Sequence, residues 1–242
     1  MADPPRSELM APPAAGRVFA GEARTGLADV APSGRVRLDA LARWLQDVAY
    51  ADVADADVAD DAIWVLRRVR LRVQRFPRFD GTARLRTYCT GIGRAWAERQ
   101  TLVEGAGGAL QAVALWVHLD PVTLRPSPLS PVEAAVYGEA GGERRVRARL
   151  HHPGPPPGAK ASAWTFRPTE VDLARHVNNS AYWQPVEADL LAGPEPAGFD
   201  GEMEFRVPAQ PGEVTVLRDA GGMWIVGADG TVHASLLGCA TT

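Results

Sequence analysis

Residues able to do acid–base chemistry lie close together in the stretch DLARHVNNSAYW, which occupies positions 172–183. Asp172 could act as a base or a nucleophile, and the His176 imidazole could move a proton or orient water. Asn178 and Asn179 are residue types that cap helices, so we expect a helix to begin here. Its first backbone N–H groups, aided by the helix dipole, would suit a developing oxyanion. The catalytic candidates are therefore Asp172, His176 and Asn178.

Each of these residues also has a purely structural interpretation. Asp172 could be a carboxylate that only caps a turn, and an isolated histidine is more often structural than catalytic. One of the two asparagines is expected to be a cap, which is worth about 1 kcal/mol over alanine. Pro185 lacks the N–H that a helix interior needs, so we predict a kink or a helix that begins after Asn179.

A long amphipathic helix and a set of alternating strands must position this stretch. Leu38, Leu41, Leu45 and Val48 recur at helical spacing, which predicts a helix from Val36 to about Val58. Alternating or apolar runs predict strands on either side of it. The expected strands are 17–25, 64–73, 82–91, 93–104 and 109–119, and later 162–168, 201–207, 213–218, 222–228 and 231–239. A second helix is expected over 179–192.

The order of elements occurs twice, which divides the chain into two halves. Residues 1–16 read as a disordered leader, 17–155 as the first half with its proline-rich connection, and 156–242 as the second half. The turn that begins at Asp29 can be laid on the turn that begins at Asp172. We therefore expect an α+β architecture in which a long helix wrapped by an antiparallel sheet is repeated.

Bulk properties exclude some classes of function. The net charge of −3 over 242 residues does not predict nucleic-acid binding. The chain has no apolar run long enough to span a membrane. Cys89 and Cys239 form no zinc or CxxC pattern, so we expect two free thiols and a cytoplasmic protein.

The chain from about residue 17 resembles the acyl-acyl-carrier-protein thioesterases, which are tandem hotdog folds. The resemblance lies in Asp172 with His176-Val-Asn-Asn and Tyr182, and in several motifs of the first half. Those motifs are Leu45-Gln46-Asp47, Trp64-Val-Leu-Arg, Gly91-Ile-Gly-Arg with Arg99, and Leu115-Trp-Val-His-Leu-Asp120. The family implies hydrolysis of a fatty acyl thioester on acyl carrier protein, as in bacterial fatty acid biosynthesis, without a metal or redox cofactor.

The resemblance also implies a tunnel for the acyl chain beside the first helix. We therefore expect Asn179, Tyr182 and Trp44 to bind substrate. Arg68, Arg70, Arg72, Arg84 and Arg86 would share one face of two neighbouring strands and could meet the anionic carrier. The protein could be a monomer of two hotdogs or a homodimer.

Three positions depart from the family pattern. Ala174 stands where the family has an asparagine, and Pro208 and Ala209 stand where it has a Glu-Cys pair. Single-hotdog thioesterases often carry Asp-x-Ala at this turn, so Asp172 keeps its candidate role. Two alternatives remain open at this level: an acyl-CoA thioesterase on the same fold, and an acyl- or pantetheine-binding hotdog that has lost its catalysis.

Overall fold

A ten-stranded antiparallel sheet runs through the computed structural model, which describes residues 7–58, 63–142 and 144–241. Its strand order is β1-β3-β4-β5-β2-β7-β10-β9-β8-β6. The strands are β1 (Val18–Arg24), β2 (Ile63–Arg75), β3 (Thr82–Ile92), β4 (Trp96–Gly105), β5 (Gly108–Leu119), β6 (Lys160–Phe166), β7 (Gly198–Phe205), β8 (Gly212–Asp219), β9 (Gly222–Val226) and β10 (Val232–Thr241). All ten lie within a few residues of the strands expected from alternation, and the fold is α+β.

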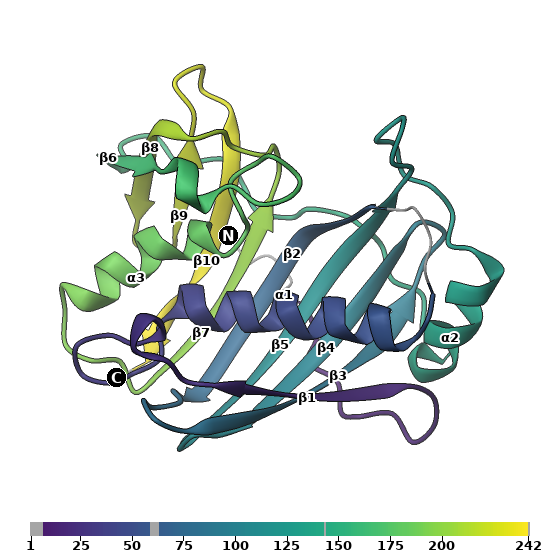
Figure 1. The fold of residues 1–242 in the computed structure, drawn as a ribbon. Helices are drawn as coiled ribbons and strands as arrows, with labels where there is room; N and C mark the ends of the chain where they lie inside the picture. Colours follow the sequence, from purple (N-terminus) through teal and green to yellow (C-terminus); the bar gives the residue numbers. More distant parts are fainter. Residues whose placement is uncertain (1–6, 59–62, 143, 242) are drawn as a thin grey trace.

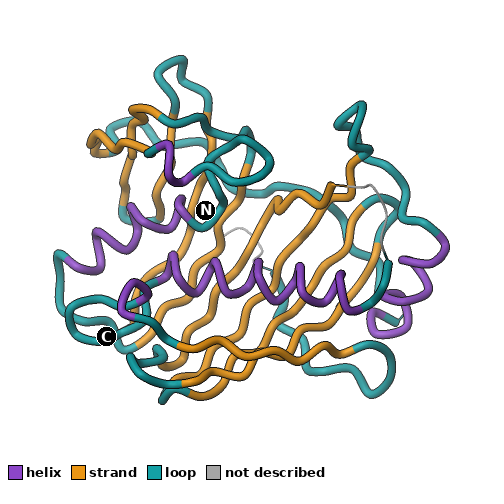
Figure 2. Tube along the Cα trace, in the orientation of Figure 1, coloured by secondary structure: helices purple, strands orange, loops and turns teal. Residues whose placement is uncertain are grey.

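The two halves of the sheet have the same strand order. In the first half it is β1-β3-β4-β5-β2, and in the second the corresponding strands follow as β6-β8-β9-β10-β7. The halves join where β2 pairs with β7. Helix α1 (Leu38–Asp55) lies across the first half, and α3 (Gln184–Leu191) lies against the second (Figures 1 and 2). A further helix, α2 (Pro131–Gly141), packs beside β3 (Figure 1).

The apolar stripe of α1 accounts for its place against the sheet. Leu38, Leu41, Leu45 and Val48 are all buried, and each fully buried leucine contributes roughly 1.5–3 kcal/mol. The helix is shorter than predicted at both ends. Its acidic C-terminal tail offers little apolar surface to bury, and Asp57 adopts a left-handed φ of 50° that stops the helix.

The second helix differs more from the prediction. A short 3-10 helix, η3 (Ala181–Trp183), comes first, and α3 follows from Gln184. Pro185 lies in the first turn of α3, where a missing N–H costs no hydrogen bond. The expectation that Pro185 delays the helix is thus confirmed.

The two turns repeat each other, but in a register that differs from the predicted one. The isolated bridge between Val30 and Val36 matches the bridge between Val171 and Val177. The backbone bonds Ala31 N to Arg35 O and Asp172 N to His176 O match in the same way. Asp172 therefore corresponds to Ala31, and the prediction that pairs it with Asp29 is wrong by two positions. Sequence similarity alone misplaced the match because the turns share few side chains.

Residues 7–16 take a defined path along the sheet, which differs from the disordered leader that was predicted. Ser7 N donates to Glu202 Oε2 at 2.8 Å, and Met10 N donates to Gln100 Oε1 at 2.8 Å. The Tyr88 hydroxyl donates to the carbonyl of Met10 at 2.9 Å. The remaining leader residues, 1–6, lie outside the described residues. Polar anchors on the sheet hold this segment, and its own composition gives no sign of them.

The expected arginine face is not formed by neighbouring strands. β4 and β5 lie between β3 and β2, so Arg84 and Arg86 are separated from the arginines of β2. The β2 arginines lie instead opposite acids of β7, in the pairs Arg68 with Glu204, Arg70 with Glu202 and Arg72 with Asp200. Their charges are largely balanced within the protein, and Arg68 is buried. The expected docking face is therefore not present as predicted.

A buried carboxylate fastens the N-terminal segment and the connection between the halves to β7. Burial opposes ionisation of Glu202, but hydrogen bonds from His152 and Ser7 and the charge of Arg68 outweigh it and lower the pKa. The ionised form is therefore the one the folded state favours. Its contribution to stability is present above the ordinary pKa of 4.5 and is lost as the pH falls through the lowered value.

We predict that Glu202→Gln lowers the free energy of unfolding at pH 7 by about 1.5–3 kcal/mol, the usual worth of hydrogen bonds to a charged group. Urea unfolding of both proteins from pH 7 to pH 3 measures the difference, which should shrink below pH 4.5. Glu104→Gln, at an exposed pair with Arg86, is the matched control and should change little. A difference that stays constant with pH would contradict this account of Glu202.

Candidate active site

Both carboxylate oxygens of Asp172 are held in place by the turn that follows it. Oδ1 accepts from Ala174 N at 2.9 Å, and Oδ2 accepts from Asn178 Nδ2 at 3.0 Å. The backbone closes the turn through Arg175, whose φ of 62° is left-handed. The two hydrogen bonds fix the direction of the Asp172 carboxylate. Asp172 is only half-buried, so a ligand can still reach it. The sequence prediction that brings Asp172 and Asn178 together is consistent with this geometry.

Asn178 links this turn to the long helix of the other half. Its side-chain amide exchanges two hydrogen bonds with Gln46 of α1, from Gln46 Nε2 to Asn178 Oδ1 at 3.2 Å and back from Nδ2 to Gln46 Oε1 at 3.3 Å. Asn178 Oδ1 also accepts from Ser180 N and Oγ in the turn before η3, while Ser180 itself is the N-cap residue of that helix. In the sequence Gln46 stands out only as part of a helix motif, because nothing local shows which turn it faces.

His176 lies in the same turn without a hydrogen bond to Asp172 from its ring. Its backbone oxygen accepts from Asp172 N at 3.1 Å. The imidazole is half-buried and makes no hydrogen bond within the described part of the chain. The backbone N–H of Asn179, the residue before the N-cap Ser180, also makes no hydrogen bond within the residues that the structure describes. The His176 ring and the Asn179 N–H are therefore both without a hydrogen-bond partner among the described residues.

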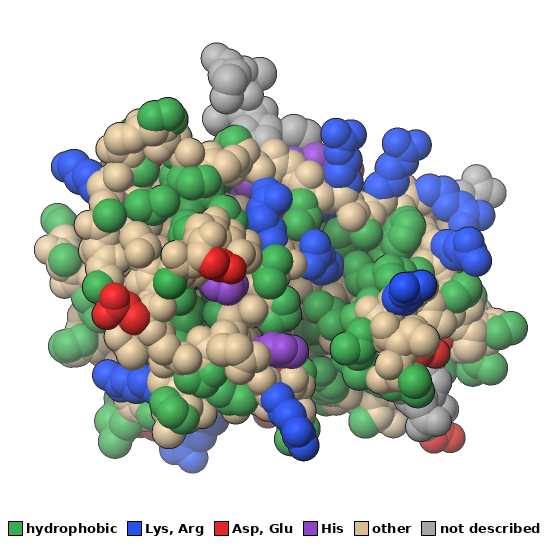
Figure 3. Space-filling view, turned by 90° about the horizontal axis from the view of Figure 1, so that it is seen from above, with side chains coloured by type: hydrophobic (Ala, Val, Ile, Leu, Met, Phe, Trp, Pro, Cys, Tyr) green, Lys and Arg blue, Asp and Glu red, His purple; other side chains and the backbone are tan. Residues whose placement is uncertain are grey.

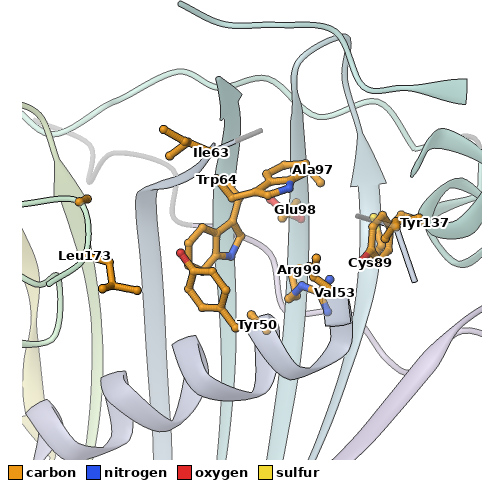
Figure 4. Close-up of a pocket in the computed structure, with 14 residues that line it drawn as sticks. Tyr50, Val53, Ile63, Trp64, Cys89, Ala97, Glu98, Arg99, Tyr137 and Leu173 are labelled. Atoms are coloured by element: carbon orange, nitrogen blue, oxygen red, sulfur yellow. The ribbon is translucent and has the colours of Figure 1, made fainter. Parts of the chain in front are cut away.

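A cavity of about 350 Å³ opens beside this turn and runs between α1 and the sheet. Leu173 and Ala174 border one end of it, and Tyr50 and Trp64 form the middle (Figure 4). Glu98, Arg99, Cys89 and Tyr137 lie at the opposite end. The lining residues are Ala49, Tyr50, Val53, Val58, Ile63, Trp64, Cys89, Ala97, Glu98, Arg99, Trp116, Tyr137, Leu173 and Ala174. Most of the wall is apolar, as suits a hydrocarbon ligand.

The predicted substrate-binding residues have different places in the structure. Asn179 lines a second, much smaller cavity under α1, together with Gln46 and Trp183. Tyr182 is buried against Phe166, and its hydroxyl accepts from Ala209 N at 2.8 Å. Trp44 is buried in the core and lines neither cavity. Of the three residues, only Asn179 lines either of these cavities.

Two tyrosines that interact with the Asp172 charge, Tyr182 and Tyr50, have raised pKa values. Burial raises the pKa of Tyr182 to about 12, with the nearby Asp172 charge adding to the shift. Partial burial and the Asp172 charge also raise the pKa of Tyr50, which lines the cavity. Both tyrosines therefore stay neutral around neutral pH and can serve as walls or hydrogen-bond donors.

The turn of the first half that corresponds to the Asp172 turn contains a buried ion pair. The offset that relates Val30 to Val171 also relates Gln46 to Glu187 of α3. Glu187 reaches the turn of the first half, where it binds the guanidinium of Arg35 and accepts from Leu38 N at 2.9 Å. Both partners are almost fully buried. The two halves thus share a framework, but the position of Asp172 in the second half is occupied by Ala31 in the first.

A second group of potential ligand atoms lies on the far side of the sheet. His152, Glu202 and Glu204 are buried, with one ligand atom of each within 4.8 Å of the others. Glu204 accepts from His151 N and His152 N, and Glu202 accepts from Ser7 N. The guanidinium groups of Arg68 and Arg206 lie beside them. These contacts fasten chain segments to β7 and place positive charge where a cation would bind.

Comparison with known proteins identifies related sequences and folds. The family described as "Acyl-ACP thioesterase N-terminal domain" matches residues 16–137. An uncharacterized protein of Mycobacterium tuberculosis is 27% identical over 213 residues, which cover 87% of this chain and 85% of that protein.

Solved structures share the fold over nearly the whole chain. An acyl-ACP thioesterase from Bacteroides thetaiotaomicron has a TM-score of 0.76 at 15% identity, covering 92% of this chain and 98% of that one. The 12:0-ACP thioesterase from Umbellularia californica has a TM-score of 0.71 at 17% identity, covering 91% and 96%. This protein and the two thioesterases therefore share the hotdog fold.

The matched positions Gln46 and Glu187 should differ sharply in their effect on stability. We predict that Glu187→Leu lowers the free energy of unfolding by about 3–5 kcal/mol, because it leaves the buried Arg35 charge without a partner. Gln46→Leu should cost about 1 kcal/mol, the worth of a neutral hydrogen bond. Adding Arg35→Met to Glu187→Leu should recover most of the loss. Equal losses for the two single variants in urea unfolding would contradict the assignment.

Proposed function

Because the chain belongs to the acyl-ACP thioesterase family and is a thioester hydrolase, we propose that it releases free fatty acid from fatty acyl-[acyl-carrier-protein]. The observation that carries the proposal is the oriented Asp172 carboxylate beside the apolar cavity. The acyl chain would occupy the cavity and the thioester would lie at the Asp172 turn. We place the enzyme in the cytoplasm and in bacterial fatty acid biosynthesis, and the buried free thiol of Cys89 suits a reducing compartment.

The repeated strand order supports a tandem hotdog as the architecture of this enzyme. We propose a first hotdog over residues 17–155, including the connection, and a second over 156–242. The halves pair through β2 and β7 within one chain, so a monomer contains the complete pair. A homodimer of such pairs is the other arrangement compatible with this scheme.

Asp172 would act first, as a base toward water or as a nucleophile toward the thioester carbon. In the base route it takes a proton from water, the oxygen attacks the carbonyl carbon, and the carbon–sulfur bond breaks. The leaving thiolate then takes up the proton that Asp172 removed from water, with His176 of the same turn as the proposed relay. Asn178 and Gln46 would keep the carboxylate directed at the substrate.

The backbone N–H of Asn179 is the best placed donor for the developing oxyanion. In the first half the corresponding N–H, that of Leu38, donates to a carboxylate oxygen of Glu187. The backbone at this point therefore presents an N–H to an anionic oxygen, and in the second half that N–H has no partner among the described residues. Donors of this kind contribute about 2.7–4 kcal/mol to acyl transfer in other enzymes.

Two of the three positions that depart from the family pattern, Ala174 and Ala209, have local explanations. Ala174 contributes its backbone N–H to Asp172, a role that needs no polar side chain. Ala209 is buried and donates its N–H to Tyr182 Oη, so this site is part of the core. The amide partners of Asp172 would then come from Asn178 and, through it, from Gln46.

Two anionic carriers fit the same reaction. The face seen in Figure 3 is hollowed, with hydrophobic side chains in the hollow and Lys and Arg side chains around it. A positive border favours an anionic carrier, which describes both acyl carrier protein and coenzyme A. We propose acyl carrier protein as the carrier, because the family takes its name from it.

Among the described residues, none of the helices has the length and apolar character that crossing a bilayer requires.

We predict that Asp172→Asn lowers kcat by about 100-fold or more, since it removes the base or nucleophile. Thiol release from acyl carrier protein and coenzyme A thioesters of several chain lengths is the measurement. Asp189→Asn, at an exposed pair with Arg218, is the matched control and should retain activity. Equal thiol release by wild type and Asp172→Asn would overturn the proposal.

Gln46→Leu should lower kcat by roughly tenfold with a smaller change in KM, because a misdirected carboxylate affects the transition state more than substrate binding. Gln74→Leu changes an exposed glutamine of β2 and serves as the control. Steady-state kinetics of both variants on the same thioester measure the effect. A change confined to KM would assign Gln46 to substrate binding instead.

A further inference from the structure

A tight turn projects beyond the end of β5, on the way to α2 (Figure 1). Asp120 closes the turn, because its Oδ1 accepts from Val122 N at 3.1 Å and from Thr123 N at 2.6 Å. The backbone adds two bonds, from Leu124 N to the carbonyl of Asp120 at 2.9 Å and from Asp120 N to the carbonyl of Arg125 at 3.0 Å. These bonds give the projecting turn a defined shape.

Two large aliphatic side chains stand at the tip of this turn. Val122 is 88% exposed and Leu124 is 62% exposed. Leu124 also has a left-handed φ of 54°, a conformation that glycine and asparagine adopt more readily than a bulky residue does. A leucine that is both strained and exposed adds little to folding stability, which points to contact with a partner. We name Val122 and Leu124 the apolar tip.

Exposed arginines lie at the same end of the sheet as the tip. Arg94 is in the turn between β3 and β4, and its carbonyl accepts from Leu129 N at 3.0 Å. Arg145 bridges to Ile92 at the end of β3. We name a set of four arginines the basic patch, all of them exposed and none paired with an acid among the residues that the structure describes: Arg94, Arg125, Arg145 and Arg147.

The tip continues one wall of the main cavity. Ile63 lines that cavity and pairs with Leu119, the last residue of β5 before the turn. Ile63 is itself 36% exposed, so the apolar wall of the cavity reaches the outside at this point. Leu173 and Ala174, next to Asp172, border the cavity from a different element. A partner at the tip would therefore lie beside the cavity without having to cover the Asp172 turn.

On these grounds we propose that the apolar tip and the basic patch dock the protein onto the anionic face of a lipid bilayer. Val122 and Leu124 enter the hydrocarbon layer, where burial of their side chains is favourable. The arginines of the basic patch lie among the lipid phosphates, because a negatively charged lipid surface attracts basic residues.

The shape of this surface favours a bilayer over a protein partner. Stable protein interfaces bury about 1,200–2,000 Å² of total surface on matched shapes. A projecting tip of two aliphatic residues offers little of that area, whereas insertion into a bilayer needs no matching surface. The basic patch supplies an attraction to anionic lipid that the net charge of −3 for the whole chain does not.

The nearness of the tip to the cavity has a consequence for product release. If the cavity holds the acyl chain, as in the proposed function, the free fatty acid would leave beside the bilayer and partition into it. Only this consequence rests on the proposed function. The docking surface itself rests on the tip, the arginines and their exposure.

Flotation of the full-length protein with lipid vesicles tests the proposal. The probes are vesicles of phosphatidylcholine alone and of an equimolar mixture of phosphatidylcholine and phosphatidylglycerol. We expect binding to the anionic vesicles to be about tenfold tighter, since each basic residue near such a surface adds to the attraction. Raised salt should weaken the binding, because exposed charges are screened. No binding to either vesicle, or equal binding to both, would overturn the proposal.

Two pairs of substitutions locate the contact. Val122→Ser with Leu124→Asn removes the apolar tip, and the turn should fold at least as well because asparagine suits the left-handed φ. Arg125→Glu with Arg145→Glu reverses half of the basic patch. Each pair should weaken vesicle binding by about tenfold or more. Undiminished binding in both pairs would contradict the assigned surface.

Matched control positions lie near the opposite end of β3, where β1 pairs with it. Leu27→Ser changes a leucine that is 79% exposed, and Arg84→Glu changes an exposed arginine of β3. Both variants should bind anionic vesicles as the wild type does. A loss in these controls equal to the loss in the tip and patch variants would overturn the assignment.

Binding of acyl carrier protein by the same variants separates the lipid surface from the rival partner. If the variants lose affinity for acyl carrier protein while the wild type binds no vesicles, the surface belongs to the carrier and the lipid proposal is wrong.

Thiol release from a soluble coenzyme A thioester separates this inference from the proposed function. Val122→Ser with Leu124→Asn should keep the wild-type rate, because the tip contains no catalytic candidate. Vesicle binding without hydrolysis of any thioester would overturn the proposed function alone. Hydrolysis without vesicle binding would overturn the docking surface alone.

Discussion

The structure depends on two helices that each reach across to the turn of the other half. Gln46 of α1 binds Asn178 in the second half, and Glu187 of α3 binds Arg35 in the first. The two contacts occupy corresponding positions of a repeated unit. They fix the halves relative to each other at the place where the candidate site is formed, so positioning of the site and packing of the halves are one constraint.

The two corresponding contacts differ in chemistry, and under the proposed function that difference places the reaction in the second half. Arg35 and Glu187 are almost fully buried and satisfy each other, which leaves no group free for a substrate. Gln46 and Asn178 are neutral and partly exposed, and Asn178 binds the Asp172 carboxylate next to Leu173 and Ala174, which border the cavity. Under the proposed function, one contact of the repeated fold supports the candidate catalytic site and the other contributes to stability.

Much of the fold could be predicted from sequence because period and turn chemistry are local signals. The strands, the first helix and the Pro185 effect follow from such signals. The register of the two turns, the path of residues 7–16 and the partner of Gln46 do not, since each depends on contacts between residues far apart in the chain. Asp172 is a candidate because of its local motif, and its catalytic role stays a prediction. The prediction of the arginine face was wrong because the strand order places β4 and β5 between its two parts.

A double-mutant cycle between Gln46 and Asn178 tests most directly whether the first half orients the catalytic carboxylate of the second. The quantity measured is kcat/KM on an acyl carrier protein thioester for wild type, Gln46→Leu, Asn178→Ala and the double variant. If Gln46 acts through Asn178, the double variant should be no slower than Asn178→Ala alone, because residues that act as a unit are not additive. Multiplication of the two single losses would show that they act independently and would contradict the account.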